Sequence, residues 1–324
     1  MRAIAKSVPP VKFRKMGHLP TLMRLKPGTS AFVTVKNLGH RGEALTFRPN
    51  ISNDCFSTDH AGFRHSVFAG DTLGLRDIVQ RERYGIVLGS SNIFGIGTRG
   101  NENTLASLLG ERFGFPFANI SLPEGTSRNL HSQFSSVLWK VPHPPAVVIH
   151  FTGGDFTAFC FSGFADAVYG PPNLKQYPTI LAERGSPPNA DDYFKPLLAF
   201  TTMWTQAIVA TCRSRKIPII IGNDTTFFEK RKPSQMDLEC KLGTPFNPNQ
   251  ERWFPNHKKF IAAYYAHREA LAAKLGVPIA GPGSSNDYSF FDEFHYDADG
   301  TRSLFESIAP SVETLLSGQR ASAA

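Results

Sequence analysis

The sequence predicts an α/β protein: a three-layer α/β/α sandwich around a parallel sheet of about five strands, with a small N-terminal β-rich extension. Two observations support this fold class. From about Arg83 onward, short apolar runs alternate with longer segments of helical periodicity, which is typical of a parallel sheet covered by helices. Ahead of that point, residues 1–82 show stretches of apolar and polar alternation instead, which is the pattern of strands.

The predicted strands of the sheet are short apolar runs. They are residues 84–89 (YGIVLG), 117–121 (FANIS), 145–151 (PAVVIHF), 218–223 (PIIIGN) and 277–280 (VPIA). Five strands are enough for a doubly wound, flavodoxin-like sheet. In the extension, the alternation is clearest in residues 29–35 (TSAFVTV) and 44–49 (ALTFRP).

Four helices are predicted between and after these strands. They cover residues 102–114, 191–215, 256–276 and about 299–316. In the first of them Leu105, Leu108 and Leu109 share one face, and a glycine at its end stops the helix. The third is expected to start at Asn256 as its cap and to end at Gly276.

We therefore divide the chain into an extension, residues 1–82, and a main domain, residues 83–324. Residues 225–255 are rich in Pro, Asn and charge, and they exceed the usual length of a connection between a strand and a helix. We interpret them as an insertion near the active face, in the position of a lid.

Composition narrows the class of protein. Hydrophobic residues make up 41% of the chain and charged residues 19%, which is typical of a globular protein. The net charge of +8 is scattered and accompanies no nucleic-acid motif, so no nucleic-acid partner is expected. The four cysteines lie far apart, which excludes paired zinc-ligand spacing, and no metal or other cofactor is predicted. No apolar run is long enough for a transmembrane segment, so a cytoplasmic location is expected, and the oligomeric state stays open.

Candidate chemistry lies at two places far apart in the chain. Ser91 follows the first strand of the sheet, where open α/β sheets place their ligands. Near the other end, Asp292 precedes His295 by three residues, just ahead of the last helix. A serine hydroxyl becomes a good nucleophile when a histidine takes its proton and an acid orients that histidine. These three residues supply those roles.

These blocks resemble the SGNH hydrolase superfamily, the GDSL-like lipases and esterases. The Gly-Ser-Ser91 turn, followed by Phe-Gly, is similar to the Gly-Asp-Ser block of the family, and Ser90 stands where the family has aspartate. Gly125 is similar to the glycine after the second strand, and Asp292 with His295 to the final Asp-x-x-His block. The resemblance covers about residues 84–316.

Residues 59–64 (DHAGFR) also look like the N-x-x-G-F-R segment that precedes this domain in some bacterial members.

The resemblance implies an acyl-enzyme on Ser91, with His295 as base and then acid, Asp292 as its orienting group, and an oxyanion hole from the backbone amides of Ser91 and Gly125. The third block departs from the family, because Gly154 stands where an oxyanion-binding asparagine is expected. Asn92 is the neighbouring candidate for that missing amide.

A literal Gly-Asn-Asp at residues 222–224 follows the next strand, but we assign the third block to residues 152–155 because they directly follow the third strand. Asn223 is still expected to line the same face.

Other patterns have simpler explanations. Residues 95–100 match G-x-G-x-x-G formally, but they lie too far from the strand end for a dinucleotide site and are interpreted as a flexible active-site loop. His131, His143 and His150 lack metal-ligand spacing and are interpreted as satisfied or exposed structural residues. An aromatic cluster follows the third block and fits an acyl pocket or core packing equally well: Phe156, Phe159, Phe161, Phe164 and Tyr169.

The resemblance implies an esterase or deacylase, or an O-acyltransferase, that acts on a small-molecule, glycan or lipid ester. Two alternatives stay open. The departure at Gly154 motivates a catalytically silent protein that binds a glycan or lipid. Residues 1–82 would alternatively be the interaction module of an accessory component in a biosynthetic or polysaccharide-modifying pathway.

Overall fold

A computed structural model describes residues 38–41, 44–123, 125–162, 190–226, 229, 250–281, 288–291 and 295–323. Within these residues the centre of the molecule is a five-stranded sheet in the order β6-β5-β7-β8-β9, and every neighbouring pair is parallel. The strands are β5 (Gly85–Leu88), β6 (Phe117–Asn119), β7 (Val147–Phe151), β8 (Ile219–Gly222) and β9 (Ile279–Ala280). This is the doubly wound order expected from the sequence, and all five predicted strands are confirmed.

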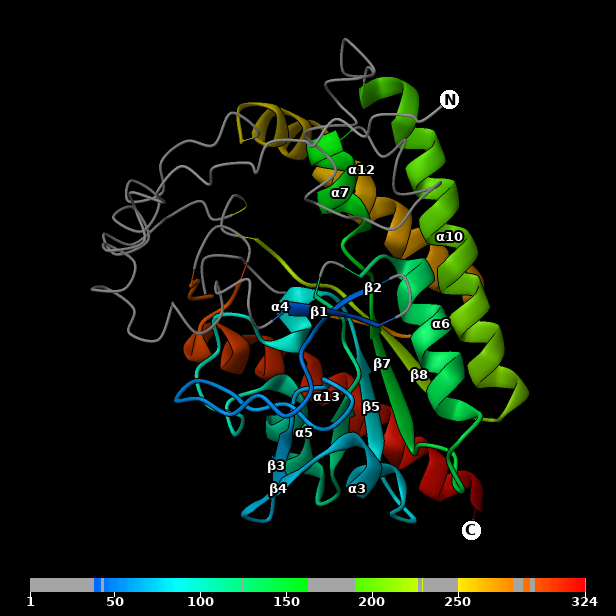
Figure 1. Cartoon of the computed structure of the whole chain (residues 1–324). Coiled ribbons are helices and arrows are strands. Elements are labelled where there is room, and N and C mark those ends of the chain that lie inside the picture. Colours follow the sequence, from blue (N-terminus) through cyan, green and yellow to red (C-terminus); the bar gives the residue numbers. More distant parts are fainter. Residues whose placement is uncertain are drawn as a thin grey trace, which may run out of the picture.

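Both faces of the sheet are buried, because alternate residues of each strand enter different cores. Ile86 of β5 packs in a core with α3 (Leu75–Val79), α6 (Ser127–Leu138), α10 (Ala190–Ser214) and α12 (Gln250–Leu275). Its neighbour Val87 packs in a second core with α5 (Leu105–Phe113) and α13 (Ala298–Ala323). Figure 1 shows these helices on the two sides of the sheet, which confirms the three-layer prediction.

The predicted helices are present with some shifted boundaries. The expected start of the third helix at Asn256 is wrong, because α12 already begins at Gln250 and Asn256 lies inside it. Residues 250–255 of the predicted insertion are therefore helical, whereas residues 227–228 and 230–249 lie outside the described residues. Among the described residues, four further helices were not predicted: α3, α4 (Ser91–Phe94), α6 and α7 (Asp155–Ser162). In α6, Leu130, Phe134 and Val137 recur at helical spacing, but polar residues separate them.

The N-terminal extension contains two short antiparallel pairs within the described residues. They are β1 (Leu38–Arg41) with β2 (Ala44–Phe47), and β3 (Ser66–Phe68) with β4 (Asp71–Leu73). Residues 29–35, which carry part of the strand prediction, lie outside the described residues. The division of the chain at residue 82 stays a prediction, but the described extension shares its core with the main domain: Phe63, Leu73 and Ile78 pack in the same cluster as β5.

Candidate active site

The carboxyl end of β5 leads directly into the predicted nucleophile. Ser90 occupies the N-cap position of the short helix α4 (Ser91–Phe94) without a side-chain capping bond, and Ser91 is the first residue of the helix. The helix ends at Gly95, whose φ of 92° lies in the left-handed region that glycine adopts without strain. The backbone N–H of Ser91 belongs to the first turn, where helix geometry offers it no intrahelical acceptor. Ser91 itself is half-buried, so its hydroxyl stands at the edge of the sheet with partial access to solvent.

The predicted base lies next to this hydroxyl. The Nε2 atom of His295 is 2.9 Å from the Oγ atom of Ser91, although 204 residues separate them in sequence. The chain around His295 is held locally, because its carbonyl accepts a hydrogen bond from the N–H of Phe291 at 2.7 Å and Tyr296 bridges to Phe290. Asp292, the predicted orienting acid, lies outside the described residues. The structure thus brings the predicted nucleophile and base into hydrogen-bonding distance.

Two of the predicted oxyanion positions, Gly125 and Gly154, have backbone N–H groups that donate to carbonyls of the protein. The N–H of Gly125 donates to the carbonyl of Leu122 at 3.0 Å, and the N–H of Gly154 donates to the carbonyl of Gly125 at 2.8 Å. A Cβ atom on Gly153 would collide with the backbone between Gly125 and Ser127, so only glycine allows this close approach. At Gly154 there is room for a side chain. The nearest neighbour of a Cβ atom there would be the carbonyl oxygen of Gly125, at 3.8 Å.

The aspartate of the third block has a structural partner. Asp155 is buried, and its carboxylate accepts hydrogen bonds from the N–H of Ser127 at 2.8 Å and from the hydroxyl of Ser127. The hydroxyl of Thr201 in α10 lies 3.5 Å away. Burial raises the pKa of Asp155 to about 6, although the bonds from Ser127 and Thr201 oppose the shift. Asp155 therefore ties the start of α7 to the start of α6.

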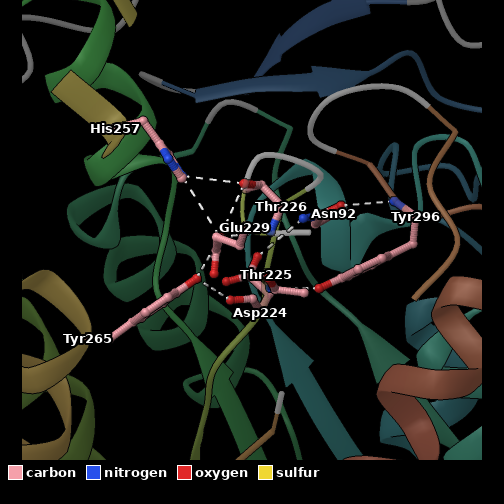
Figure 2. A network of polar contacts seen from close by, with 8 residues as sticks. All are labelled: Asn92, Asp224, Thr225, Thr226, Glu229, His257, Tyr265 and Tyr296. Atoms are coloured by element: carbon pink, nitrogen blue, oxygen red, sulfur yellow. Dashed lines mark hydrogen bonds and ion pairs between the residues drawn. The ribbon is translucent and has the colours of Figure 1, made fainter. Parts of the chain in front are cut away.

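Asn92, the candidate substitute for the missing amide, has different partners from those expected. Figure 2 shows its side chain between two segments from distant parts of the sequence. Its Oδ1 atom accepts from the backbone N–H of Tyr296 at 3.2 Å, and its Nδ2 atom donates to Oδ2 of Asp224 at 3.3 Å. The hydroxyl oxygen of Tyr296 accepts in turn from the N–H of Thr225 at 2.7 Å. The amide of Asn92 is thus occupied by the protein itself.

A second set of polar contacts extends from Asp224 toward α12 (Figure 2). The hydroxyl of Tyr265 donates to the carbonyl of Asp224 at 2.7 Å and lies 3.1 Å from Oε1 of Glu229. Oε1 of Glu229 also accepts from the N–H of Thr226 at 2.9 Å and lies 3.8 Å from Nε2 of His257. Burial raises the pKa of Asp224 and of Glu229, and it lowers the pKa of His257 to about 4.

The sequence reasoning missed most of this network. Asp224 belongs to the Gly-Asn-Asp run that was set aside as the third block, and a polar run after a central strand is the signal that pointed to it. Asn223 is buried, and its side-chain oxygen has no hydrogen-bond partner within the described part of the chain.

The loop at residues 95–100, interpreted above as an active-site loop, is tied to the extension. The buried guanidinium of Arg64 donates to the carbonyls of Thr98 at 2.7 Å and Gly100 at 2.9 Å, and also to that of Gly95. Gly97 has a φ of 87°, and a Cβ on it would lie 2.5 Å from the Cβ of Phe291. The loop therefore packs against the segment that leads to His295, and the Gly-Phe-Arg of residues 62–64 ends in the side chain that holds the loop.

The structure describes part of the aromatic cluster that follows the third block, and it also describes His150. Phe156 and Phe159 are buried between α7, α10 and α12, which identifies them as core residues, whereas Phe164 and Tyr169 lie outside the described residues, as does the side chain of Phe161. The interpretation of His150 as satisfied or exposed is wrong. His150 is fully buried in β7, and neither ring nitrogen has a hydrogen-bond partner among the described residues.

The described residues contain no group of three or more His, Cys, Asp or Glu side chains placed to hold a metal ion. None of their helices has the length and apolar character that crossing a membrane requires.

The sequence matches no protein-family model and no curated protein. Among solved structures, the chain is similar to a GDSL-like lipase from Bacteroides thetaiotaomicron, with 13% identity, a TM-score of 0.44, and 72% of this chain and 89% of that chain covered. It is also similar to a carbohydrate acetylesterase family member from Sinorhizobium meliloti, with 14% identity, a TM-score of 0.43, and coverage of 72% and 99%. The salicylyl-acyltransferase of a tetracycline biosynthetic pathway has 14% identity, a TM-score of 0.40, and coverage of 73% and 55%. The fold assignment rests on the strand order of the chain itself.

Proposed function

We propose that this chain is an SGNH-type serine enzyme that hydrolyses a carboxylic ester or transfers its acyl group through an acyl-enzyme on Ser91. One observation carries the proposal: the 2.9 Å separation between Oγ of Ser91 and Nε2 of His295 at the carboxyl edge of the sheet. A hydroxyl beside an imidazole nitrogen is the arrangement that activates serine as a nucleophile. The substrate would be a small-molecule, glycan or lipid ester.

The proposed reaction has two halves. The hydroxyl oxygen of Ser91 attacks the ester carbonyl carbon while Nε2 of His295 takes its proton, and the carbonyl oxygen becomes an oxyanion. The tetrahedral intermediate collapses, the alcohol leaves, and His295 returns the proton to the leaving oxygen. In the second half, water or an acceptor alcohol gives its proton to His295 and attacks the acyl-enzyme. The second tetrahedral intermediate then collapses, His295 returns the proton to the hydroxyl oxygen of Ser91, and the acid or the transferred ester is released. Asp292 is proposed to orient His295.

The oxyanion needs donors that are free when it forms. The N–H of Ser91 meets that need, because it has no intrahelical acceptor at the first turn of α4. The N–H of Gly125 would contribute after it turns away from the carbonyl of Leu122, to which it now donates at 3.0 Å. A hole of two backbone donors without the family's asparagine favours slow turnover, since one such donor contributes about 10²- to 10³-fold.

Labelling with a fluorophosphonate tests the proposal. The wild-type chain, Ser91→Ala and His295→Gln are compared, and the modified peptide is identified by mass spectrometry. We expect an adduct on Ser91 in the wild type, none in Ser91→Ala, and slow labelling in His295→Gln. A folded wild-type chain that stays unlabelled at Ser91 would contradict the enzyme proposal.

One observation favours a second candidate, a binding protein with a silent site. The amides of Gly125 and Gly154 both donate to carbonyls of the protein, so neither is ready for an oxyanion in this conformation. On this alternative, Ser91→Ala leaves the affinity for a glycan or lipid ester unchanged and no turnover is measured in either form.

A further inference from the structure

The candidate nucleophile and base come from segments 204 residues apart, so contacts between the two segments must fix their relative position. Ser91 is followed by Asn92 and His295 is followed by Tyr296. The side chain of Asn92 accepts a hydrogen bond from the backbone N–H of Tyr296 at 3.2 Å. One bond thus joins the residue after the nucleophile to the residue after the base.

The other half of the Asn92 amide is fixed as well. A backbone N–H can only donate, so the oxygen of Asn92 must face Tyr296 and the Nδ2 group must face Asp224, where Oδ2 lies 3.3 Å away. Thr225, the next residue, donates its N–H to the hydroxyl oxygen of Tyr296 at 2.7 Å. Asn92, Tyr296 and residues 224–225 therefore form a closed ring of three hydrogen bonds (Figure 2).

Two of the three bonds are shielded from water. Asn92 is 8% exposed and Tyr296 is 1% exposed, so water competes poorly with the bonds that involve Tyr296, whereas Asp224 is half-buried and its bond to Asn92 is only partly buried. Tyr296 also packs against the rings of Phe290 and Tyr288, which keeps its side chain in place. A ring of this kind restricts both segments to one relative position, whereas a single exposed bond would not.

We propose that Asn92 and Asp224 are positioning residues that hold His295 against Ser91, with Asp224 setting the orientation of the Asn92 amide. Neither side chain is proposed to touch the substrate. The inference rests on the proposed function, because it concerns the same nucleophile and base. It predicts that the rate of Ser91 labelling depends more on the hydrogen bond that Asn92 donates to Asp224 than on the charge of Asp224.

A pair of isosteric substitutions tests this directly. Asn92→Asp keeps the size and the acceptor for Tyr296, but it sets a carboxylate against the carboxylate of Asp224, so we expect the rate of Ser91 labelling to fall about 10- to 100-fold. Asp224→Asn still offers an acceptor to Asn92 and should stay within about threefold of the wild type. The double variant Asn92→Asp/Asp224→Asn restores a donor opposite an acceptor, and we expect it to recover most of the lost rate.

The control must separate positioning from general loss of stability. Ser107→Ala removes a buried hydroxyl of α5 that accepts a hydrogen bond from the N–H of Val67 and donates one to the carbonyl of Asn101. These bonds involve neither Ser91 nor His295. It should lower the melting temperature without changing the labelling rate. If Asn92→Asp labels as fast as the wild type, or if the double variant shows no recovery while remaining folded, the positioning role is wrong.

A readout independent of chemistry separates this proposal from the enzyme proposal. In histidine-labelled protein, the ¹⁵N resonance of His295 Nε2 reports the contact with Ser91, and the shift caused by Ser91→Ala measures that contact. We expect a clear shift in the wild-type background and a much smaller one in the Asn92→Asp background. If the wild type is never labelled but the shift depends on Asn92, the enzyme proposal fails and the positioning role stands. If labelling occurs and the shift is the same in both backgrounds, the positioning role fails.

Discussion

At the scale of single residues, the candidate site has its nucleophile and its base in contact, but it lacks one of the expected oxyanion donors. The hydroxyl of Ser91 and the imidazole of His295 are in contact at 2.9 Å. The oxyanion side lacks the asparagine that the family resemblance calls for, and Gly154 takes its place. Its backbone does not occupy the left-handed region that only glycine tolerates well, so no conformational reason requires glycine there.

Restoring the missing amide is therefore expected to raise activity. A Cβ at Gly154 would meet nothing nearer than 3.8 Å, so Gly154→Asn should fit without moving the backbone. We expect its turnover of an activated aryl ester to exceed that of the wild type by about 10-fold or more, because a third oxyanion donor is added.

Gly154→Ala is the matched control, since it fills the same space without a donor, and it should turn over the ester at the wild-type rate. Equal rates for the Asn and Ala variants would show that position 154 does not face the oxyanion.

At the scale of secondary-structure elements, buried polar contacts fix the connections at the carboxyl edge of the sheet. Asp155 at the start of α7 accepts two hydrogen bonds from Ser127 at the start of α6. The cap of α6 is itself reciprocal, because Thr126 and Asn129 each bond the other's backbone. The loops that contribute Gly125 and Gly154 are thereby held together.

The pKa of Asp155 predicts a pH dependence of stability. Burial raises this pKa to about 6, above its ordinary value in the unfolded chain, so protonation favours the folded state. The contribution of Asp155 is then fully present below about pH 4 and is lost as the pH rises through about 6. We expect Asp155→Asn, which cannot ionise, to gain unfolding free energy relative to the wild type over that window.

Urea unfolding of both proteins at several pH values measures this difference. In the Ser127→Ala background, the pH at which the difference in unfolding free energy is complete should be higher, because the hydroxyl bond that is removed lowers the pKa of Asp155. A difference between the two proteins that does not vary with pH would contradict the assignment.

At the scale of the whole molecule, residues of the N-terminal extension contact the helix and the loop that follow Ser91. Phe47 of β2 stacks on Phe94 of α4, with ring centroids 4.8 Å apart, and Phe56 packs edge-on against Phe47. Arg64 reaches from the extension to the loop at residues 95–100. The helix that carries Ser91 and the loop after it are therefore supported by residues that precede the predicted main domain.

This support predicts a large effect of substituting Arg64. Its guanidinium serves several buried carbonyls at once, and the compact ammonium of lysine cannot satisfy them together. We expect Arg64→Lys to lower the unfolding free energy by about 3 kcal/mol, since buried carbonyls lose charged donors.

Arg112→Lys provides the comparison, because Arg112 pairs with Glu313 where both side chains are more than half exposed, and such pairs contribute about 0–1 kcal/mol. Chemical denaturation of both variants measures the difference, and equal effects would contradict the proposed role of Arg64.

The sequence by itself determined the sheet, four of the helices around it and two of the residues at the candidate site. Strands such as residues 147–151 are short apolar runs between helices, and this local pattern is enough to predict a parallel sheet. The sheet order then places Ser91 at its carboxyl edge. The helix α6 was missed because polar residues dilute its apolar face.

Only the tertiary structure decided what surrounds Ser91 and His295. The bonds from Asn92 to Tyr296 and to Asp224 span 204 and 132 residues, so no local pattern encodes them. The same holds for Arg64, whose carbonyl partners in the loop at residues 95–100 lie 31 to 36 residues away. The types of residue and their spacing indicate which hydrogen bonds are possible. The packing of distant segments then selects the partner, because most buried donors and acceptors bond to a group that lies beside them in the folded chain.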